Sequence, residues 1–370
     1  MNWPGGCVVC TALPDDRAAL GSALPGKQDF DDDHAADTAA SFPRRITMTS
    51  AILPPGLAGD LDVLAFAEAE LAAGRPAALI TIVGLDGPFS RPLGAQLAVA
   101  GDKRFAGSIS GGCLEQALTE EAQIAMREGD NRVLRYGRGS PYLDVRLPCG
   151  GGIDLHVDAS PDRKLLQNAI ALGRARKSFA MGFNVAAPRS TLRLIESDSG
   201  VRPDEFVRRY SPQLRILLAG RGWEIVAMSQ MAQTANVELV VASQEPATLE
   251  FCKPYANQLV RLTTPAVAPE LPFDDYTAVA CLFHEHEWEA PLLLEALRSP
   301  AFYVGALGSR QTHQRRVEAL RELGAGGGDI ARLKGPIGLF ASQDPRSLAV
   351  SALAEIVQMW NARNDKGGRR

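Results

Sequence analysis

The chain has 370 residues, of which 46% are hydrophobic and 22% are charged, so it is long enough for two domains that each bury a core. Its formal net charge of -4, without a basic stripe that carries aromatic residues, argues against nucleic acid and anionic membrane as partners, because both bind a net basic face. No apolar run approaches the roughly 20 residues that cross a bilayer, and the start of the chain lacks a signal-peptide pattern, so we expect a cytoplasmic protein.

Residues 1–47 differ in composition from the rest of the chain. They contain the charged run DFDDDH, scattered Pro and Gly, and no helical or strand periodicity, so we expect them to be disordered. Cys7 and Cys10 form a CVVC pair here, but no βαβ context or second ligand pair follows that would make it a redox or metal site. We expect Met48 to be the biological start, and all six cysteines to be thiols rather than a disulfide framework.

Residues 56–160 are predicted to form a mixed α/β domain. Apolar residues recur at helical spacing after Asp60, and Gly74 is suited to end that helix. The pattern then predicts a strand at 77–83, a hairpin made of QLAVA and RFAGSIS, a helix at 113–128, and the strands RVLRYG and GGGIDLHVD.

Residues 161–211 are predicted to be a connector, with a helix at 163–177 and a hairpin around 188–190. In residues 212–362, strands and helices alternate. The expected strands are LRILLAG, VELVVAS, TAVACLF and FYVGALG, and helices are expected up to about residue 235 and at 289–298, 312–323 and 346–360. This alternation predicts βαβ units in a doubly wound parallel sheet.

The turn AGRGWEI at 219–225 is related to a dinucleotide-binding fingerprint, which needs three glycines. Gly220 and Gly222 supply two of them, but Ile225 occupies the place of the third. Ser243 ends the second strand, where an acidic residue would hold a ribose hydroxyl. We therefore do not expect NAD or NADP to bind.

The segment GALGSRQTHQRR at 305–316 leads from a strand into a helix. Gly308 permits a tight turn, and Ser309 and Arg310 begin a helix whose free N–H groups favour an anion. Arg315 and Arg316 are further candidates to bind a phosphate. The alternative interpretation is a solvated basic helix face.

Two histidines follow the expected strand TAVACLF. His284 and His286 are spaced i, i+2, so on a strand they would point the same way, as metal ligands can. The alternative is a polar strand end. Ligands in doubly wound folds bind beyond the carboxyl ends of the strands, so His284 is a candidate contact in either case.

Two cysteines lie beside glycines in the N-terminal domain. In GSISGGCLE (107–115), Cys113 comes at a helix start, and Cys149 precedes Gly150 and Gly151, which allow close approach of a ligand. A helix N-terminus lowers the pKa of a thiol, and the thiolate is a nucleophile or a soft metal ligand. The alternative is a pair of small buried cysteines in turns.

Four motifs together resemble a known family. GSISGGCLE, the CGG at 149–151, YVGALGSRQTHQRR and PIGLFASQDPRSLAVSALAEIV are similar, in this order, to the XdhC/CoxI family of accessory proteins for molybdenum hydroxylases such as xanthine dehydrogenase. The resemblance covers about residues 56–360 and implies a Rossmann-like C-terminal domain.

The resemblance implies a non-catalytic role. Such a protein binds molybdenum cofactor (molybdopterin), protects it while a cysteine desulfurase-type partner supplies sulfur, and helps to insert it into an apo molybdenum hydroxylase. A homodimer is also implied. Cys113 would be the metal ligand, and the cofactor phosphate would bind at the helix start after Gly111 and Gly112 or at the one after Ser309. The candidate cofactor-binding residues are Ser110, Gly111, Gly112, Cys113, Glu115, Cys149, Gly150, Gly151, Gly220, Gly222, His284, Gly305, Gly308, Ser309 and Arg310.

Two functions of other classes stay open at this stage. One is an NAD(P)-dependent oxidoreductase, against which the incomplete fingerprint argues. The other is a hydrolase or transferase that uses Cys113 as nucleophile and either His156 or His284 as base. The second function requires a contact between thiol and imidazole.

Overall fold

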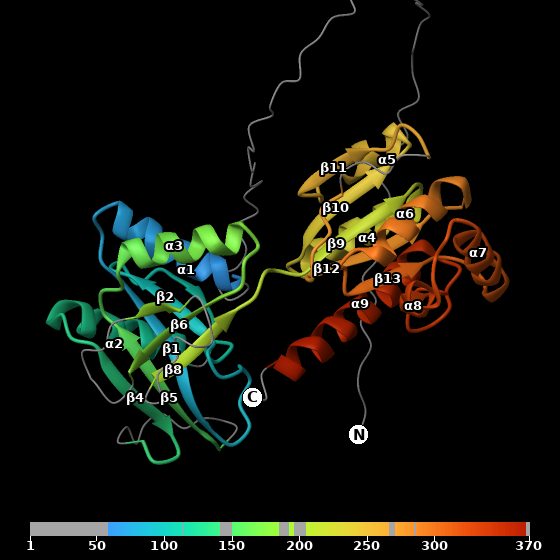
Figure 1. Ribbon diagram of the computed structural model, residues 1–370. Coiled ribbons are helices and arrows are strands. Elements are labelled where there is room, and N and C mark those ends of the chain that lie inside the picture. Colours follow the sequence, from blue (N-terminus) through green and yellow to red (C-terminus); the bar gives the residue numbers. More distant parts are fainter. Residues whose placement is uncertain are drawn as a thin grey trace, which may run out of the picture. The chain divides into compact units, whose positions relative to one another are not determined.

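The computed structural model describes residues 58–112, 114–140, 150–184, 192–195, 205–265, 271–284 and 286–367 (Figure 1). The predictions for residues 1–47, including the CVVC pair, and for Met48, Cys113 and Cys149 lie outside these residues. Within the described ranges, no helix combines the length and the apolar character needed to cross a membrane.

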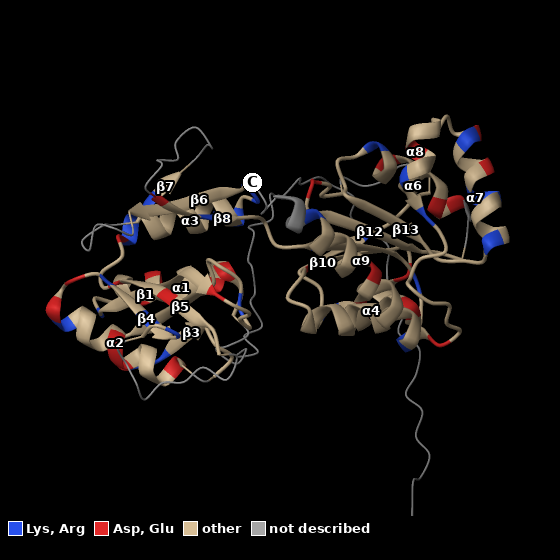
Figure 2. Ribbon diagram, turned by 90° about the horizontal axis from the view of Figure 1, so that it is seen from below, with Lys and Arg blue, Asp and Glu red and all other residues tan. Residues whose placement is uncertain are grey.

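The N-terminal domain is built on a five-stranded antiparallel sheet of order β3-β2-β1-β5-β4. Its elements are α1 (Asp60–Ala72), β1 (Ala77–Asp86), β2 (Gln96–Ala100), β3 (Phe105–Gly107), α2 (Glu115–Glu128), β4 (Arg132–Gly137) and β5 (Gly152–Asp158). Leu114 and Leu118 pack on one face of the sheet, and Leu64 of α1 packs on the other. Figure 2 shows α2 on one side of this sheet. The predicted mixture of helices and strands, including the hairpin of β2 and β3, is confirmed.

The segment that we predicted to be a connector contains a second, three-stranded antiparallel sheet. It comprises α3 (Arg163–Arg174), β6 (Phe179–Asn184), β7 (Arg193–Ile195) and β8 (Glu205–Tyr210), with strand order β7-β6-β8. Leu166 and Phe183 belong to the same buried cluster as Leu64 and Leu79. This segment therefore packs as part of the N-terminal core. The expected hairpin corresponds to the pairing of β6 with β7, and residues 185–191 between them lie outside the described residues.

The C-terminal domain is a six-stranded parallel sheet of order β11-β10-β9-β12-β13-β14, with helices on both faces. Its elements are β9 (Arg215–Gly220), α4 (Trp223–Thr234), β10 (Glu238–Ser243), α5 (Pro246–Cys252), β11 (Gln258–Arg261), β12 (Thr277–Leu282), α6 (His286–Arg298), β13 (Tyr303–Ala306), α7 (Arg310–Glu322), α8 (Gly327–Arg332), β14 (Leu333–Lys334) and α9 (Pro345–Gly367). The chain order of the strands reverses between β9 and β12, which defines a topological switch point. The predicted doubly wound, Rossmann-like sheet is confirmed.

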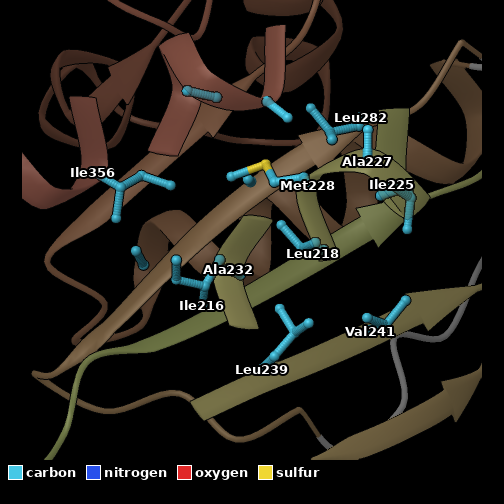
Figure 3. Packing of buried hydrophobic residues seen from close by; sticks show 14 of the residues in the cluster. Ile216, Leu218, Ile225, Ala227, Met228, Ala232, Leu239, Val241, Leu282 and Ile356 are labelled. Carbon is cyan, nitrogen blue, oxygen red and sulfur yellow. The ribbon is translucent and has the colours of Figure 1, made fainter. Parts of the chain in front are cut away.

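Alternating strand residues fill the two layers of the C-terminal core. Ile216 and Leu218 lie in one buried cluster with residues of α4 and α9 (Figure 3). Leu217 lies in the cluster on the other face of the sheet. Each such side chain is fully buried, which stabilises the fold by about 1.5–3 kcal/mol per residue. This packing fixes the carboxyl ends of β9, β12 and β13, where the connecting loops begin.

Candidate functional site

The turn that precedes α2 is held together by one carboxylate. Glu115 is the first residue of α2 and is only 5% exposed. Its Oε1 accepts hydrogen bonds from Ser108 Oγ (3.0 Å), Ile109 N (3.0 Å) and Ser110 N (2.9 Å), and its Oε2 accepts from Ser110 Oγ (2.5 Å), Gly112 N (2.8 Å) and Leu114 N (3.2 Å). A side chain that we predicted to bind a cofactor therefore organises the turn itself.

The same hydrogen bonds set the charge of this carboxylate. Burial alone would raise the pKa of Glu115, but the hydrogen bonds from Ser110, from the backbone of Glu115 and from Ser108 outweigh it and lower the pKa to about 2. The remaining amide of the turn, Gly111 N, donates to Ser108 Oγ at 3.1 Å. Among the described residues of this turn, the N–H groups of Ile109, Ser110, Gly112 and Leu114 therefore already donate to an internal anion, which argues against a phosphate at Gly111 and Gly112.

The outer side of this turn is open. Gly111 and Gly112 have φ angles of 75° and 117°, and no atom lies within 4 Å of where a Cβ would stand on either residue. A ligand can therefore approach the backbone next to position 113 closely. Cys113 itself lies outside the described residues.

The second glycine motif leaves the sheet at the same end. Gly107 of β3 pairs with Leu97 near the start of β2, and Gly152 at the start of β5 pairs with Asp86 at the end of β1. Since β1 is antiparallel to both β2 and β5, the end of β3, the start of β2, the end of β1 and the start of β5 all lie at the same end of the sheet. Gly150 is exposed, whereas a Cβ on Gly151 would lie 2.6 Å from the carbonyl oxygen of Asp86, so Gly151 has a packing role.

His156 is a poor partner for a thiol at the start of α2. Ile153, Leu155 and Val157 of β5 share the buried cluster of α2, and alternation along the strand places His156 on the opposite face. There it stacks on Phe183 of β6 with ring centroids 4.0 Å apart, and burial lowers its pKa to about 4. The structure therefore argues against a Cys113–His156 pair.

A cavity of about 350 Å³ lies in the C-terminal domain, beyond the carboxyl ends of β12 and β13. Helices α4, α7 and α9 all begin at it. Its lining residues are Glu224, Phe283, His284, Leu307, Gly308, Thr312, Ser342, Gln343, Asp344, Pro345 and Leu348. This is the place where doubly wound sheets bind ligands. A shallower cavity of about 520 Å³ between α6 and residues 271–273 lies away from these strand ends.

The three helix starts differ in charge. The first turn of α4 contains Glu224, and α9 is preceded by Asp344, whose pKa is lowered by hydrogen bonds from Ser347. Helix α7 is capped by a neutral residue, because Ser309 Oγ accepts a hydrogen bond from Thr312 N at 3.1 Å. Its first residue is the exposed Arg310. Of the three, the start of α7 is therefore the favourable place for an anion.

Gly308 forms the turn into α7. Its φ of 141° lies in the region that side chains avoid, and a Cβ there would lie 2.9 Å from Thr312 Cγ2. The structure argues against a ligand contact of Gly305, because this residue is buried within β13 and the ring of Tyr303 occupies the space beside it. Arg316 is also not available to a phosphate at the surface, since it is 1% exposed.

The glycine turn after β9 makes internal contacts. A Cβ on Gly220 would lie 2.5 Å from the carbonyl oxygen of Leu282, so glycine lets β9 and β12 approach closely. Gly222 N donates to Thr248 Oγ1 of α5 at 3.0 Å, and Ile225 is fully buried. The amide that would face a pyrophosphate is therefore hydrogen-bonded within the protein. Weak or absent nicotinamide dinucleotide binding stays a prediction.

The two histidines do not share a strand. Strand β12 ends at Leu282, His284 lies in the following loop, and His286 is the first residue of α6. The i, i+2 arrangement on one strand, considered above as a possible ligand pair, is therefore not formed. The side chain of His284 is 58% exposed, with Nε2 4.0 Å from Glu224 Oε2 at the cavity. Among the described residues, no group of three or more His, Cys, Asp or Glu side chains could hold a metal ion.

Several cavity residues were not predicted from the sequence. They are Glu224 and the segment 342–345, which the sequence singled out only as part of a family motif. One signal was present: Asp344 followed by Pro345 is a typical helix start, and helices of a doubly wound sheet begin at the edge where ligands bind.

Comparisons with known proteins agree with this architecture. Residues 216–356 match the XdhC Rossmann domain family, and residues 70–137 match the XdhC and CoxI family. The chain is 32% identical to the molybdenum cofactor insertion chaperone PaoD of Escherichia coli strain K12, over 80% of this chain and 87% of that protein. It is 24% identical to a protein of Bacillus subtilis strain 168 described as a probable xanthine dehydrogenase subunit, over 76% and 92%.

A solved structure has a similar fold. It is the crystal structure of a xanthine dehydrogenase from Bacillus halodurans, which is 22% identical in sequence. The TM-score is 0.67, and the likeness covers 81% of this chain and 96% of that one.

Proposed function

Because this chain belongs to the XdhC and CoxI family, we propose that it is a maturation chaperone that binds molybdenum cofactor and inserts it into a molybdenum hydroxylase of the xanthine dehydrogenase type. The observation that carries the proposal is the 350 Å³ cavity at the switch point, where three helices begin. Its volume is suited to a small organic ligand. The role is non-catalytic: the protein holds and transfers a cofactor.

The cavity suits an organic ligand that is anionic at one end. The start of α7, with Ser309 and Arg310, would hold the cofactor phosphate. Glu224 and Asp344 line the same cavity and can accept hydrogen bonds from the N–H groups of a pterin. When bound, the cofactor supplies the redox-active molybdenum that the target enzyme needs.

The N-terminal domain would protect the metal end of the cofactor. Cys113 is the proposed soft ligand, and the open backbone of Gly111 and Gly112 leaves room for it. Glu115 acts from within by fixing the shape of the turn. Gly150 lies just before the start of β5 at the same end of the sheet, and Gly150 with the preceding residue in sequence, Cys149, is the proposed second contact.

The partners of the proposed function are two proteins and a second copy of the chain. The recipient is an apo molybdenum hydroxylase, and a cysteine desulfurase-type enzyme would supply the terminal sulfur while the chaperone holds the cofactor. A homodimer would complete the assembly. We propose that all of this takes place in the cytoplasm.

The test is to purify the chain from cells that make molybdenum cofactor and from cells that lack the pathway. Protein from the first cells should carry pterin in an amount comparable to the protein and should activate an apo molybdenum hydroxylase, whereas protein from the second should do neither. Protein from cofactor-replete cells that carries no pterin and gives no activation would exclude the function.

A further inference from the structure

A buried ion pair lies directly behind the turn that leads into α7. Arg316 of α7 and Glu289 of α6 are 1% and 2% exposed, and Arg316 Nη2 lies 2.9 Å from Glu289 Oε1. The same Nη2 donates a hydrogen bond to the carbonyl oxygen of Leu307. Arg316 Nη2 therefore contacts both the Glu289 carboxylate of α6 and the backbone of Leu307, which lines the cavity.

The position of this guanidinium bears on the adjoining peptide. Leu307 and Gly308 both line the cavity, and a Cβ on Gly308 would lie 3.4 Å from Arg316 Nη2. A donor to the carbonyl of Leu307 fixes the plane of the Leu307–Gly308 peptide, because the six atoms of a peptide unit are coplanar. It thereby fixes the direction of the Gly308 N–H and the path of the backbone into Ser309, the N-cap residue of α7.

Stability alone is a weak explanation for this pair. Burying an ion pair costs about as much desolvation free energy as the attraction returns, and apolar residues of similar volume are often equally stabilising. Arg316 also leaves Nε and Nη1 buried without a hydrogen-bond partner among the described residues, which adds to the cost. The buried guanidinium of Arg316 therefore needs an explanation other than stability, and its contact with the cavity wall suggests a role in ligand binding.

We propose that Arg316, held by Glu289, is a positioning residue that presets the α7 turn to receive an anionic group of the ligand. It touches no ligand itself and acts through the Leu307 carbonyl. The inference rests on the proposed function only in the identity of the ligand, a phosphate-bearing cofactor.

The test separates positioning from stability with one double variant of the full chain. Arg316→Met alone removes the guanidinium beside the buried carboxylate of Glu289 and should lower Tm strongly. Combining Arg316→Met with Glu289→Met removes both charges, so Tm should return close to the wild-type value, while the Leu307 carbonyl still lacks its donor. Arg315→Met is the matched control, because Arg315 is the exposed neighbour on the same helix.

Two readouts are compared at equal Tm. The double variant lacks the charge-assisted hydrogen bond from Arg316 to the Leu307 carbonyl, so amide hydrogen exchange at Gly308 and Ser309 should be roughly tenfold faster. Because the turn is then no longer held in its binding conformation, the affinity for inorganic pyrophosphate should be roughly tenfold weaker. Wild-type exchange in the double variant would overturn the inference, as would unchanged pyrophosphate affinity. If the wild-type protein binds no pyrophosphate, the proposed anion site fails, and the exchange rates alone still decide the role of Arg316.

Discussion

Ser110 donates two hydrogen bonds to Glu115, one from its hydroxyl to Oε2 at 2.5 Å and one from its backbone N–H to Oε1 at 2.9 Å. Both carboxylate oxygens are thus bound by a single residue on the opposite side of the turn. The turn that carries position 113 is therefore closed by a charge-assisted link within eight residues of chain, 108–115.

Replacing Glu115 by Gln should destabilise the protein by about 2–3 kcal/mol, because the amide removes the charge and turns an NH₂ group toward backbone donors. Urea unfolding measures this change. Glu120→Gln on the same helix is the matched control and should cost less than about 0.5 kcal/mol, since Glu120 only forms an exposed pair with Lys103 at 3.9 Å. Equal urea midpoints for the two variants would contradict the role assigned to Glu115.

Acid should destabilise the protein partly through His156. Its folded-state pKa is about 4, below the ordinary value of 6.5, so between these values the unfolded chain binds more protons than the folded one. The stability contributed by neutral, buried His156 is complete above pH 6.5 and is lost as the pH falls toward 4. His156→Leu should therefore gain Tm relative to wild type as the pH is lowered through this window.

Asp158, two residues further along β5, provides a comparison of opposite sign. Burial raises its pKa from 3.8 to about 6, against hydrogen bonds from Ser160, Leu192 and Asn131. Between pH 3.8 and 6 the folded state binds more protons, so this group favours folding at the acid end. Asp158→Asn should lose Tm relative to wild type as the pH falls from 6 to 4. If the Tm of each variant changed with pH in parallel with that of the wild type, both assignments would be refuted.

The cysteines should divide into two classes when each is changed to Ser. Cys113→Ser should fold normally but retain far less pterin and fail to activate the hydroxylase, and Cys149→Ser should show a smaller effect of the same kind. Cys252 and Cys281 are buried in the C-terminal core, so their Ser variants should lose stability but keep the cofactor. Pterin content and Tm measured on the same preparations separate the two effects, and full activity of Cys113→Ser would remove this residue from the site.

Gly308→Ala should weaken binding of phosphate-bearing ligands, because the added Cβ meets Thr312 in a backbone conformation that Ala avoids. Gly328→Ala in α8 is the control: no atom lies within 4 Å of its Cβ position, and the change should be neutral or stabilising by about 0.4–1 kcal/mol. Calorimetric titration with pyrophosphate compares the two variants. Equal affinities would show that the α7 turn does not contact the anion.

The parallel sheet was predictable because its central strands are short, continuous apolar runs between helices. LRILLAG and TAVACLF became β9 and β12, each buried on both faces. The small sheet of β6 to β8 was missed because its strands do not alternate cleanly: the buried Arg208 of β8 would be read as a surface residue, yet it pairs with Asp60 at 2.6 Å and lies over the ring of Tyr210.

The site was predictable where all residues of a turn belong to one short sequence motif, as at Gly308 and Ser309 before α7. The cavity was harder to predict, because it joins α4, α7 and α9, whose starts are up to 122 residues apart in the chain. At Gly305 the sequence alone suggested a glycine that faces a ligand, whereas in the structure this glycine makes room for a tyrosine ring. The role of Glu115 was also missed: the capping-box spacing accounts for its bond from Gly112 N three residues earlier, but not for its bonds from Ser108, Ile109 and Ser110.

The internal bonding of the Glu115 turn has a consequence for a protein that must give up what it carries. A loop that becomes ordered only when its cargo binds has to fold at each loading and unfold at each release, and part of the binding free energy is used for this ordering. Here Glu115 supplies an internal anion that accepts hydrogen bonds from Ser110, Gly112 and Leu114, so we expect these residues to keep their conformation with and without cargo. For the proposed carrier function, this arrangement would allow moderate affinity and rapid exchange of the cofactor, and transfer to a recipient would require no unfolding of the turn.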